Sequence, residues 1–500
     1  MRELGGHKGR GLKSIDWKLV IYYLLLVMIG WINIYASIQN EEPSSIFDLG
    51  HRCGMQLIWI ASGLVLAGII LFLVSPRIYE GFSLPIYLFV LCLLIAVIFL
   101  GVEINGSRSW FDFGKVKFQP AEISKISTSL LLATVMSQLG YKINRTKDFL
   151  ITAAIIVIPM LVIIMESETG LSLVYVGFIF MLYREGLSGW LIFMLGMAIL
   201  TFILTMSTSV FTTILVLAAV ASFCIFLYSG WFKLWFITCL PAIILMAFVP
   251  DILEALSTTT ITTMEGTEEI VTEEVHPFWS KIRPGYILWI VLGGLIPTTI
   301  YFAYKNNNKV NQLTTIAFLA GILLVYSTDF IFNNVLQYHQ RTRIEVLLGL
   351  KDDPTGIGYN VNQSMIAIGS GGFFGKGYLN GTQTAYGFVP EQSTDFIFCT
   401  IGEEWGFFGC AIVILIYALF IWRIIKDAEK SREAFTRIYG YCVACCLFMH
   451  LFINIGMTLG IMPVIGIPLP LISYGGSSMW GFTILIFIFI ALNRNENKYY

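Results

Sequence analysis

One polar, glycine-rich stretch, from Tyr338 to Glu404, holds most of the groups in this chain that could do chemistry. It contains glycines, amides, a few cations and several carboxylates, and apolar runs lie on both sides of it. A membrane protein has little reason to keep such a stretch unless it lines a site. Asp395 stands where the stretch returns to an apolar segment. Its side chain could cap the start of a helix, or it could be a reactive carboxylate.

Two ionisable residues stand at the start of another apolar run, in the sequence QPAEISK at 119–125. Proline suits the first turn of a helix. Glu122 and Lys125 are three residues apart, so they can pair on one face of that helix. Ionisable residues inside membrane spans are costly and are often functional. We interpret them as a neutralised pair that fixes helix packing, and a part in the site stays open.

Two short polar segments interrupt the apolar runs elsewhere. Residues 105–114 (NGSRSWFDFG) include Arg108 and Trp110, which could form an ordinary interfacial anchor or hold the anionic head of a lipid. Residues 166–170 (ESETG) separate two apolar runs. They predict a tight reversal of the chain, or a pair of acids that binds a cation.

Two further segments indicate irregular backbone. Residues 461–478 (IMPVIGIPLPLISYGGSS) are apolar but contain three prolines, which excludes a regular helix. Irregular backbone at membrane depth must be shielded by protein or line a cavity, so we expect a cavity beside the polar stretch. The cluster GSGGFFGKG at 369–377 is no nucleotide loop, because Ser370 replaces the first glycine and Gly377 the magnesium-binding Ser or Thr. Its lysine, Lys376, could still meet a phosphate.

The composition defines the class of protein. The chain has 500 residues, of which 57% are hydrophobic and 13% charged, whereas about 25% are charged in soluble proteins. Its mean hydropathy is +0.77. We therefore predict an all-α polytopic integral membrane protein. The net charge of −1 says nothing about nucleic acid, but no basic patch is large enough to suggest it, so no nucleic-acid partner is expected. The nine cysteines show no metal-binding spacing and are interpreted as small apolar fillers.

About fourteen apolar segments are long enough to span a membrane. They lie near residues 17–37, 53–74, 80–101, 119–139, 149–166, 169–184, 189–206, 209–229, 231–249, 286–304, 311–331, 396–422, 438–459 and 474–492. The first is interpreted as an uncleaved helix rather than a signal peptide.

The distribution of charge predicts the orientation. Lys and Arg are dense at 141–147, 305–309 and 423–437, whereas residues 250–285 carry a run of carboxylates. The positive-inside rule then places both termini in the cytoplasm. It places 250–285, interpreted as a solvated loop, and the large loop near 338–394 on the outer face.

Five segments together resemble the SEDS family (shape, elongation, division, sporulation), which includes RodA and FtsW. They are GSRSWFDFG, FQPAEISKI, GYNVNQSMIAIGSGGFFGKG, VPEQSTDFIFCTIGEEWGFFG and NIGMTLGIMPVIGIPLPLISYGGSS, in the family's order. Within the family, the sequence Gly381-Thr382-Gln383 resembles RodA rather than FtsW. The family's QPDLGT element is replaced here by ESETGL at 166–171.

The resemblance implies a single SEDS-type membrane domain over residues 1–500. The family usually has ten spans, so about four extra helices are expected in 189–331, an insertion region whose outer loop is 250–285. Replacing one span by five adds an even number of membrane crossings. The matching motifs that follow the insertion therefore stay on the side of the membrane that the family implies. Residues 332–395 would form a large extracytoplasmic functional loop.

The resemblance implies a peptidoglycan glycosyltransferase that polymerises undecaprenyl-linked lipid II at the outer face of the plasma membrane during cell elongation and cell-shape maintenance. A class B penicillin-binding protein would be its partner and supply the transpeptidase, and membrane lipids would surround it. The acceptor hydroxyl must lose a proton, and Asp395 is the expected general base. Burial should raise the pKa of Asp395, while a helix dipole and cationic neighbours lower it.

The donor sugar would leave as a diphosphate, so cations should lie near it. The outward candidates are Arg108, Arg341, Arg343 and Lys376. A divalent cation (Mg²⁺ or Mn²⁺) at Asp395 could also neutralise the leaving group. The complete substrate-binding set expected from the resemblance is Arg108, Trp110, Gln119, Glu122, Lys125, Arg341, Arg343, Gln363, Lys376, Glu391, Thr394 and Ser473.

Two other functions fit the same residues. A lipid II flippase would also contain broken helices and membrane acids. It would need polar residues along a path through the midplane, however, whereas this chain concentrates them at the outer face. A noncatalytic scaffold for the penicillin-binding protein is the third hypothesis. An assay for glycan chains would separate the three.

Overall fold

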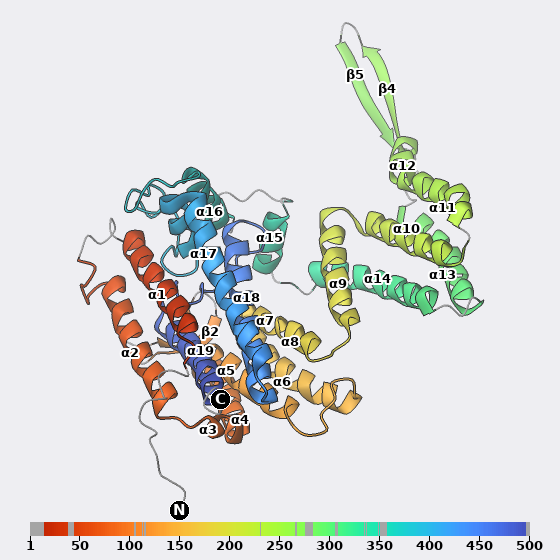
Figure 1. Cartoon of the computed structure of the whole chain (residues 1–500). Coiled ribbons are helices and arrows are strands. Elements are labelled where there is room, and N and C mark those ends of the chain that lie inside the picture. Colours follow the sequence, from red (N-terminus) through yellow and green to blue (C-terminus); the bar gives the residue numbers. More distant parts are fainter. Residues whose placement is uncertain are drawn as a thin grey trace, which may run out of the picture. The chain divides into compact units, whose positions relative to one another are not determined.

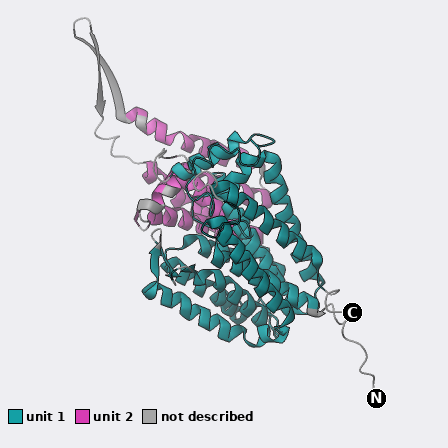
Figure 2. Ribbon diagram, turned by 90° about the vertical axis from the view of Figure 1, so that its left-hand side faces the viewer, with its two compact units in different colours: residues 1–192, 352–500 teal, residues 193–351 magenta. Residues whose placement is uncertain are grey.

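The computed structural model describes residues 15–38, 45–104, 107–112, 114, 117–230, 232–265, 268–275, 284–305, 309–334, 336, 338–348, 350 and 358–496. The chain divides into two compact units, one formed by residues 1–192 with 352–500 and the other by 193–351 (Figure 2). Helices dominate both, so the predicted all-α class is confirmed. The domain boundaries expected from the sequence stay a prediction.

The first unit begins with helices and a small sheet (Figure 1). Its first elements are α1 (Trp17–Ile38), α2 (Arg52–Phe72), α3 (Pro76–Gly81), α4 (Ser83–Leu100), β1 (Val102–Ile104), β2 (Ser107–Asp112) and β3 (Lys117–Phe118). The strands form one antiparallel sheet in the order β1-β2-β3. The next elements are α5 (Pro120–Met136), α6 (Thr146–Met165), α7 (Thr169–Val176), α8 (Phe178–Arg184) and α9 (Gly189–Ser207), which runs into the second unit. The unit ends with α16 (Tyr359–Ser370), α17 (Ile397–Lys430), α18 (Ala434–Thr458) and α19 (Gly476–Glu496).

Helices α18 and α19 form the centre of the first unit. In their most apolar windows, 83% and 78% of the residues are buried, whereas the share is below half in every other long apolar helix described. Helix α18 packs against α5 and α17, and α19 packs against α2. The outer helices expose many large apolar side chains, as helices that face lipid do. The core of this unit therefore forms around α18 and α19 together with α5, most of whose residues are also buried, while the other long apolar helices are less buried.

The count of spans differs from the prediction. Within the described part of the chain, eleven helices are long and apolar enough to cross a membrane. The other predicted spans fall on shorter helices: α5, the pair α7 and α8, and α11 (Phe232–Ala247). The chain is therefore a multi-pass membrane protein, and the predicted number of fourteen is not confirmed.

The second unit has a small apolar core of its own. Its helices are α10 (Val210–Tyr228), α11, α12 (Val249–Ser257), α13 (Pro284–Lys305), α14 (Lys309–Asn334) and α15 (Tyr338–Leu347). Buried side chains of α10, α13 and α14 pack together, among them Ile214, Leu292 and Val325. The rings of Trp289 and Tyr326 stack at a centroid distance of 5.3 Å.

Two segments expected to be loops contain regular structure. Residues 250–285 include most of α12 and an antiparallel hairpin of β4 (Thr258–Glu265) and β5 (Glu268–Val275). Many of the hairpin's residues are β-branched Thr, Val and Ile, which favour strands. The stretch 338–394 includes α15 and α16, and Ser364 and Ala367 on α16 are buried. By contrast, 459–475 contains no helix, as its prolines predict.

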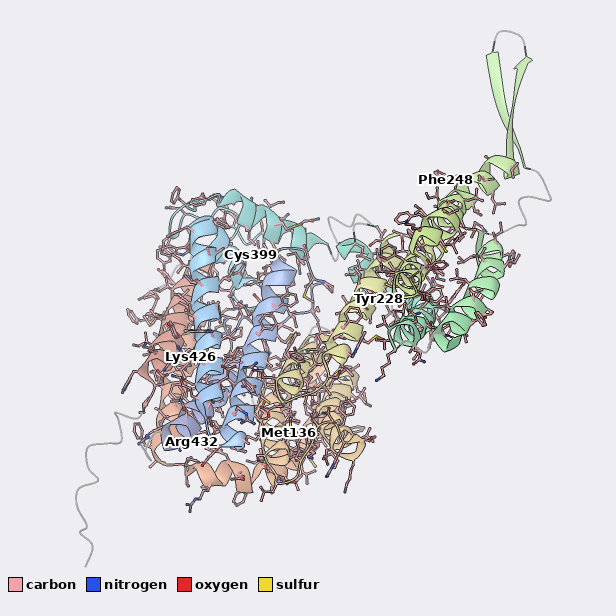
Figure 3. The ribbon with its side chains drawn as sticks, turned by 45° about the vertical axis from the view of Figure 1, so that its right-hand side comes forward. Met136, Tyr228, Phe248, Cys399, Lys426 and Arg432 are labelled. Atoms are coloured by element: carbon pink, nitrogen blue, oxygen red, sulfur yellow. The ribbon has the colours of Figure 1, made fainter. Side chains whose placement is uncertain are left out.

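The glycine cluster at 369–377 is a packing device. A Cβ atom on Gly371 would lie 2.0 Å from the carbonyl oxygen of Gly402, and one on Gly375 would lie 2.1 Å from that of Glu404. The backbones of the cluster and α17 are hydrogen-bonded to each other, from Gly377 N to Glu404 O at 2.9 Å, for example. Only glycine permits this approach. The cluster thereby holds α16 against the start of α17. In Figure 3, Cys399 marks this end of α17, and Lys426 lies toward its other end.

Candidate functional site

Asp395 lies at the junction between the start of α17 and the irregular segment 459–475. The Nδ2 atom of Asn454, on α18, donates hydrogen bonds to the Asp395 carbonyl oxygen at 2.8 Å and to the Ile467 carbonyl oxygen at 2.7 Å. Asn454 is fully buried, whereas Asp395 is partly exposed. A Cβ atom on Gly466 would lie 3.2 Å from Asp395 Oδ2. One buried amide thus fixes the backbone of Asp395 against the broken segment.

The surroundings of Asp395 disfavour its ionised form. Burial, followed by the negative charges of Glu391 and Glu168, raises the pKa of Asp395 from 3.8 to about 7. None of the described residues donates a hydrogen bond to its carboxylate. The N-cap of α17 is Phe396, and no side chain caps the helix, so the capping role considered for Asp395 is wrong. A carboxylate with this pKa can accept a proton near neutral pH.

Acidic side chains from the turn between α6 and α7 reach the same site. Ser167 has a φ of 66°, which confirms the predicted tight reversal. Glu168 Oε1 accepts hydrogen bonds from Ser109 Oγ at 2.6 Å, Ser107 Oγ at 2.8 Å and Gln119 Nε2 at 3.2 Å. Burial and the charge of Glu168 raise the pKa of Glu166 to about 8. The turn, β2 and the start of α5 thus place Glu168 close enough for its charge to act on Asp395.

The residues before Asp395 are tied to the end of the irregular segment. Ser473 Oγ donates a hydrogen bond to Thr394 O at 2.5 Å, and the Tyr474 amide donates one to Ser393 O at 2.9 Å. Thr394 Oγ1 in turn donates to Glu391 Oε2 at 3.1 Å. Glu391 is exposed. The structure therefore brings three predicted residues, Glu391, Thr394 and Ser473, together beside Asp395.

One cation beside the site, Arg52, was not among the residues predicted from the sequence. Arg52, the first residue of α2, donates a hydrogen bond from Nη1 to Ser393 Oγ at 2.6 Å. Its guanidinium lies 6.0 Å from the centre of the Tyr474 ring. The only signal in the sequence was a single arginine at the start of an apolar run, and nothing there placed it near residue 393.

The cations predicted from the sequence already have carboxylate partners. Lys376 Nζ lies 2.6 Å from Glu403 Oε1, and Arg108 Nε lies 3.5 Å from Glu103 Oε2. Arg341 belongs to the second unit, where it pairs with Glu345 at 2.8 Å. These three are therefore not free cations.

Four other predicted residues have different settings. The side chain of Arg343 lies outside the described residues. Trp110, on β2, and Gln363, on α16, are partly exposed. Gln119 is buried and directed to Glu168, as described above.

Glu122 and Lys125 form the predicted ion pair, at 2.6 Å, with each side chain only 2% exposed. Lys125 Nζ also lies 3.2 Å from Nε2 of the buried His450 and 3.7 Å from the centre of the Phe482 ring. Because an ammonium group has only donors, His450 Nε2 must accept, and its Nδ1 proton is directed to Pro468 O at 3.4 Å. The pair is thus built into the helix core and linked to the irregular segment.

Metal coordination by several side chains finds no support in the described part of the chain. No group of three or more His, Cys, Asp or Glu residues is arranged there to hold an ion. Glu168, whose charge acts on Asp395 from the turn between α6 and α7, already accepts three hydrogen bonds on one oxygen. The predicted Mg²⁺ or Mn²⁺ therefore stays a prediction, without a cluster of three such ligands among the described residues.

The fold and site define a multi-pass membrane protein with a carboxylate of raised pKa where α17 meets the irregular segment 459–475. The sequence matches the cell cycle protein family FtsW/RodA/SpoVE over residues 16–224 and 288–498. The chain belongs to this family, and the predicted membership in the SEDS proteins is confirmed.

Relatives of known annotation cover most of the chain. It is 30% identical to the peptidoglycan glycosyltransferase RodA of Treponema pallidum, over 97% of this chain and 99% of the relative. It is also 30% identical to the peptidoglycan glycosyltransferase MrdB of Escherichia coli K12, over 84% of this chain and 80% of the relative.

Two solved structures have a similar fold. A chain from a peptidoglycan synthase complex matches with a TM-score of 0.56 and 21% identity, over 96% of this chain and 98% of its own. The rod shape determining protein RodA of Thermus thermophilus matches with a TM-score of 0.52 and 20% identity, over 96% of this chain and 97% of its own.

Proposed function

We propose that this chain is a peptidoglycan glycosyltransferase that polymerises lipid II into glycan strands. The observation that carries the proposal is the carboxylate of the partly exposed Asp395, which is free of hydrogen-bond donors among the described residues and has a pKa raised to about 7. A general base works best when its pKa lies near the working pH. The names of the two 30% identical relatives supply the reaction class, and Asp395 supplies the group that this reaction needs.

The chemistry follows from the position of this base. The ionised Asp395 carboxylate accepts the proton of the acceptor's 4-hydroxyl as that oxygen attacks the anomeric carbon of the donor sugar. A carbon–oxygen bond forms between the sugars, and the bond from the anomeric carbon to the diphosphate oxygen breaks. The lipid diphosphate leaves with the bonding electrons. Asn454 acts through the backbone of Asp395, because it fixes that residue against Ile467.

Location and partners form part of the proposal. We place the chain in the plasma membrane with both termini in the cytoplasm and Asp395 at the outer face, on the distribution of Lys and Arg. A class B penicillin-binding protein is the proposed partner for crosslinking, by analogy with the fold match to a chain from a peptidoglycan synthase complex. A divalent cation stays a prediction, and no step above is assigned to it.

The test is a glycan assay with the purified full-length chain. The protein would be incubated with lipid II and a class B penicillin-binding protein whose transpeptidase is blocked, and glycan chains would be separated by length. We expect Asp395→Asn to lower the rate at least ~100-fold, since loss of a general base typically costs about 10²–10⁴. The exposed Asp251→Asn serves as a matched control with unchanged rate.

Three outcomes would overturn the proposal or the role of Asp395 in it. Near-normal polymerisation by Asp395→Asn would move the base elsewhere. If the wild-type chain makes no glycan but transfers lipid II between the leaflets of a vesicle, it is a flippase. If it does neither yet binds the penicillin-binding protein, it is a scaffold.

A further inference from the structure

Arg52 is the exposed cation that lies beside the catalytic segment. It contacts Ser393, two residues before Asp395, and Tyr474, one residue after Ser473. Gln56, one helical turn along α2, accepts a hydrogen bond from the Gly475 amide at 3.3 Å. Two side chains on the same face of α2 therefore connect this helix to the two segments that flank the site, one around residue 393 and the other around residues 474–475.

The partners of Arg52 leave its charge uncompensated. Its contacts within the described part of the chain are a neutral hydroxyl and an aromatic ring, and no described carboxylate lies within ion-pair distance. Lys376 and Arg108, in contrast, are paired with carboxylates. An arginine has five N–H donors in a planar fork, of which Ser393 takes one. The others remain available to an anion.

The local electrostatics make such a cation necessary. Glu391 and Glu168 act on Asp395 with negative charge. A diphosphate that approaches this group of acids would be repelled without a cation nearby, and the guanidinium fork matches phosphate oxygens with paired hydrogen bonds. We propose that Arg52 binds the diphosphate of the lipid-linked sugar donor and stabilises it as the leaving group. The inference rests on the proposed function for its substrate, but its binding step can be tested alone.

The first experiment measures binding rather than turnover. Undecaprenyl diphosphate would be titrated into the detergent-solubilised full-length chain, and phosphatidylglycerol would be titrated in parallel. We expect Arg52→Ala to weaken binding of the diphosphate about tenfold or more, and Arg52→Lys to weaken it less, since it keeps the charge and loses the fork. Asp395→Asn should bind at least as tightly as the wild type does, because it removes a negative charge near the diphosphate. Arg77→Ala, an exposed arginine on α3, is the matched control.

The second experiment measures steady-state polymerisation of lipid II. We expect Arg52→Lys to lower kcat, because a leaving group gains charge in the transition state, and Ser393→Ala, which frees rather than removes the guanidinium, to retain most activity. If Arg52→Ala does not fold, Arg52→Lys and Arg52→Gln carry both measurements.

The outcomes separate this inference from the proposed function. Unchanged affinity for undecaprenyl diphosphate in the folded Arg52 variants would falsify it, even if the wild type polymerises lipid II. An equal loss of affinity for phosphatidylglycerol would also overturn it, because Arg52 would then bind membrane headgroups in general. Diphosphate binding that depends on Arg52 in a chain that makes no glycan would support it while the proposed function fails.

Discussion

Two carboxylates near the start of α17 have opposite environments. Glu403 is fully buried, and its oxygens accept hydrogen bonds from the amides of Thr382, Gln383 and Thr384, each at 2.8 Å, in addition to the Lys376 ion pair. Asp395, eight residues earlier, is partly exposed, and its carboxylate receives no hydrogen bond from a described residue. The same helix end therefore carries one saturated carboxylate and one unsatisfied carboxylate.

The difference separates a structural acid from a reactive one. Three backbone amides and an ammonium group stabilise the charge of Glu403, so its ionised form holds the loop 376–384 against α17. Nothing comparable stabilises the charge of Asp395, and burial with neighbouring acids raises its pKa to about 7. Hydrogen-bond donors around a carboxylate favour its ionised form, so such an acid takes up a proton only with difficulty. A carboxylate without these donors takes up a proton more readily.

Glu403→Ala should give the largest effect on stability. It removes the acceptor for three amides and Lys376, which costs about 3–5 kcal/mol because charge and donors are left unpaired. Asp395→Asn should not destabilise the chain. Thermal unfolding of the purified variants in detergent would compare them, with Lys376→Ala as a control of smaller effect. Equal stability of Glu403→Ala and the wild type would mean that the loop does not depend on this carboxylate.

The Glu122–Lys125 pair extends the comparison to the helix core. Either single change to Ala should cost about 3 kcal/mol, because one buried charge loses its partner. The double variant Glu122→Lys, Lys125→Glu should recover expression better than either single variant, measured as folded protein after gel filtration. Single variants that express normally but make no glycan would instead place the pair in the site.

Gly375→Ala tests how the glycine cluster supports Glu403. Gly375 has a φ of +80°, and its Cβ would lie 2.1 Å from the Glu404 carbonyl oxygen. We expect a loss of about 1–3 kcal/mol from the overpacked contact, with added strain from the positive φ. Gly369→Ala is the matched control, since nothing lies within 4 Å of a Cβ there. If both variants unfold at the wild-type temperature, the backbone contact is not essential.

The sequence predicted the class of the protein better than the geometry of its candidate site. Apolar runs of spanning length, the three prolines of 461–478 and the Glu122–Lys125 spacing each reflect local physics, and the structure contains their consequences. The candidate base was found because it ends a polar stretch. The predicted count of fourteen spans was not confirmed, since α5, α7, α8 and α11 are shorter than the eleven candidate spans.

Contacts between distant segments could not be predicted from a single sequence. Lys376 was a candidate for phosphate until the structure placed it on Glu403, 27 residues away. Arg52 contacts Ser393 across 341 residues, and no spacing rule connects them. The Glu168 turn departs from the family's usual sequence, and only the fold places its charge near Asp395. What the sequence lacked was the pairing of charges, which determines the cations that remain free.

The smallest and sharpest test is the pH dependence of polymerisation. The base must be ionised, and the pKa of Asp395 is about 7, so kcat/KM should rise about tenfold per pH unit below pH 7 and level off above it. Folding stability should change in the opposite direction: an acid whose pKa is raised on folding loses stability as the pH rises from about 4 to 7. Asp395→Asn should therefore unfold at a higher temperature than the wild type at pH 8, with the difference vanishing near pH 4.

Glu391→Gln tests the cause of the raised pKa. It removes the neighbouring carboxylate whose charge raises the pKa of Asp395 more than that of Glu168 does, but it keeps an acceptor for Thr394. The midpoint of the rate profile should therefore move to lower pH. Asp112→Asn, an exposed acid on β2, should leave it unchanged. A profile that is flat between pH 6 and 8, or a midpoint that ignores Glu391→Gln, would show that Asp395 does not titrate as its environment implies, and the contrast with Glu403 would then lose its meaning for catalysis.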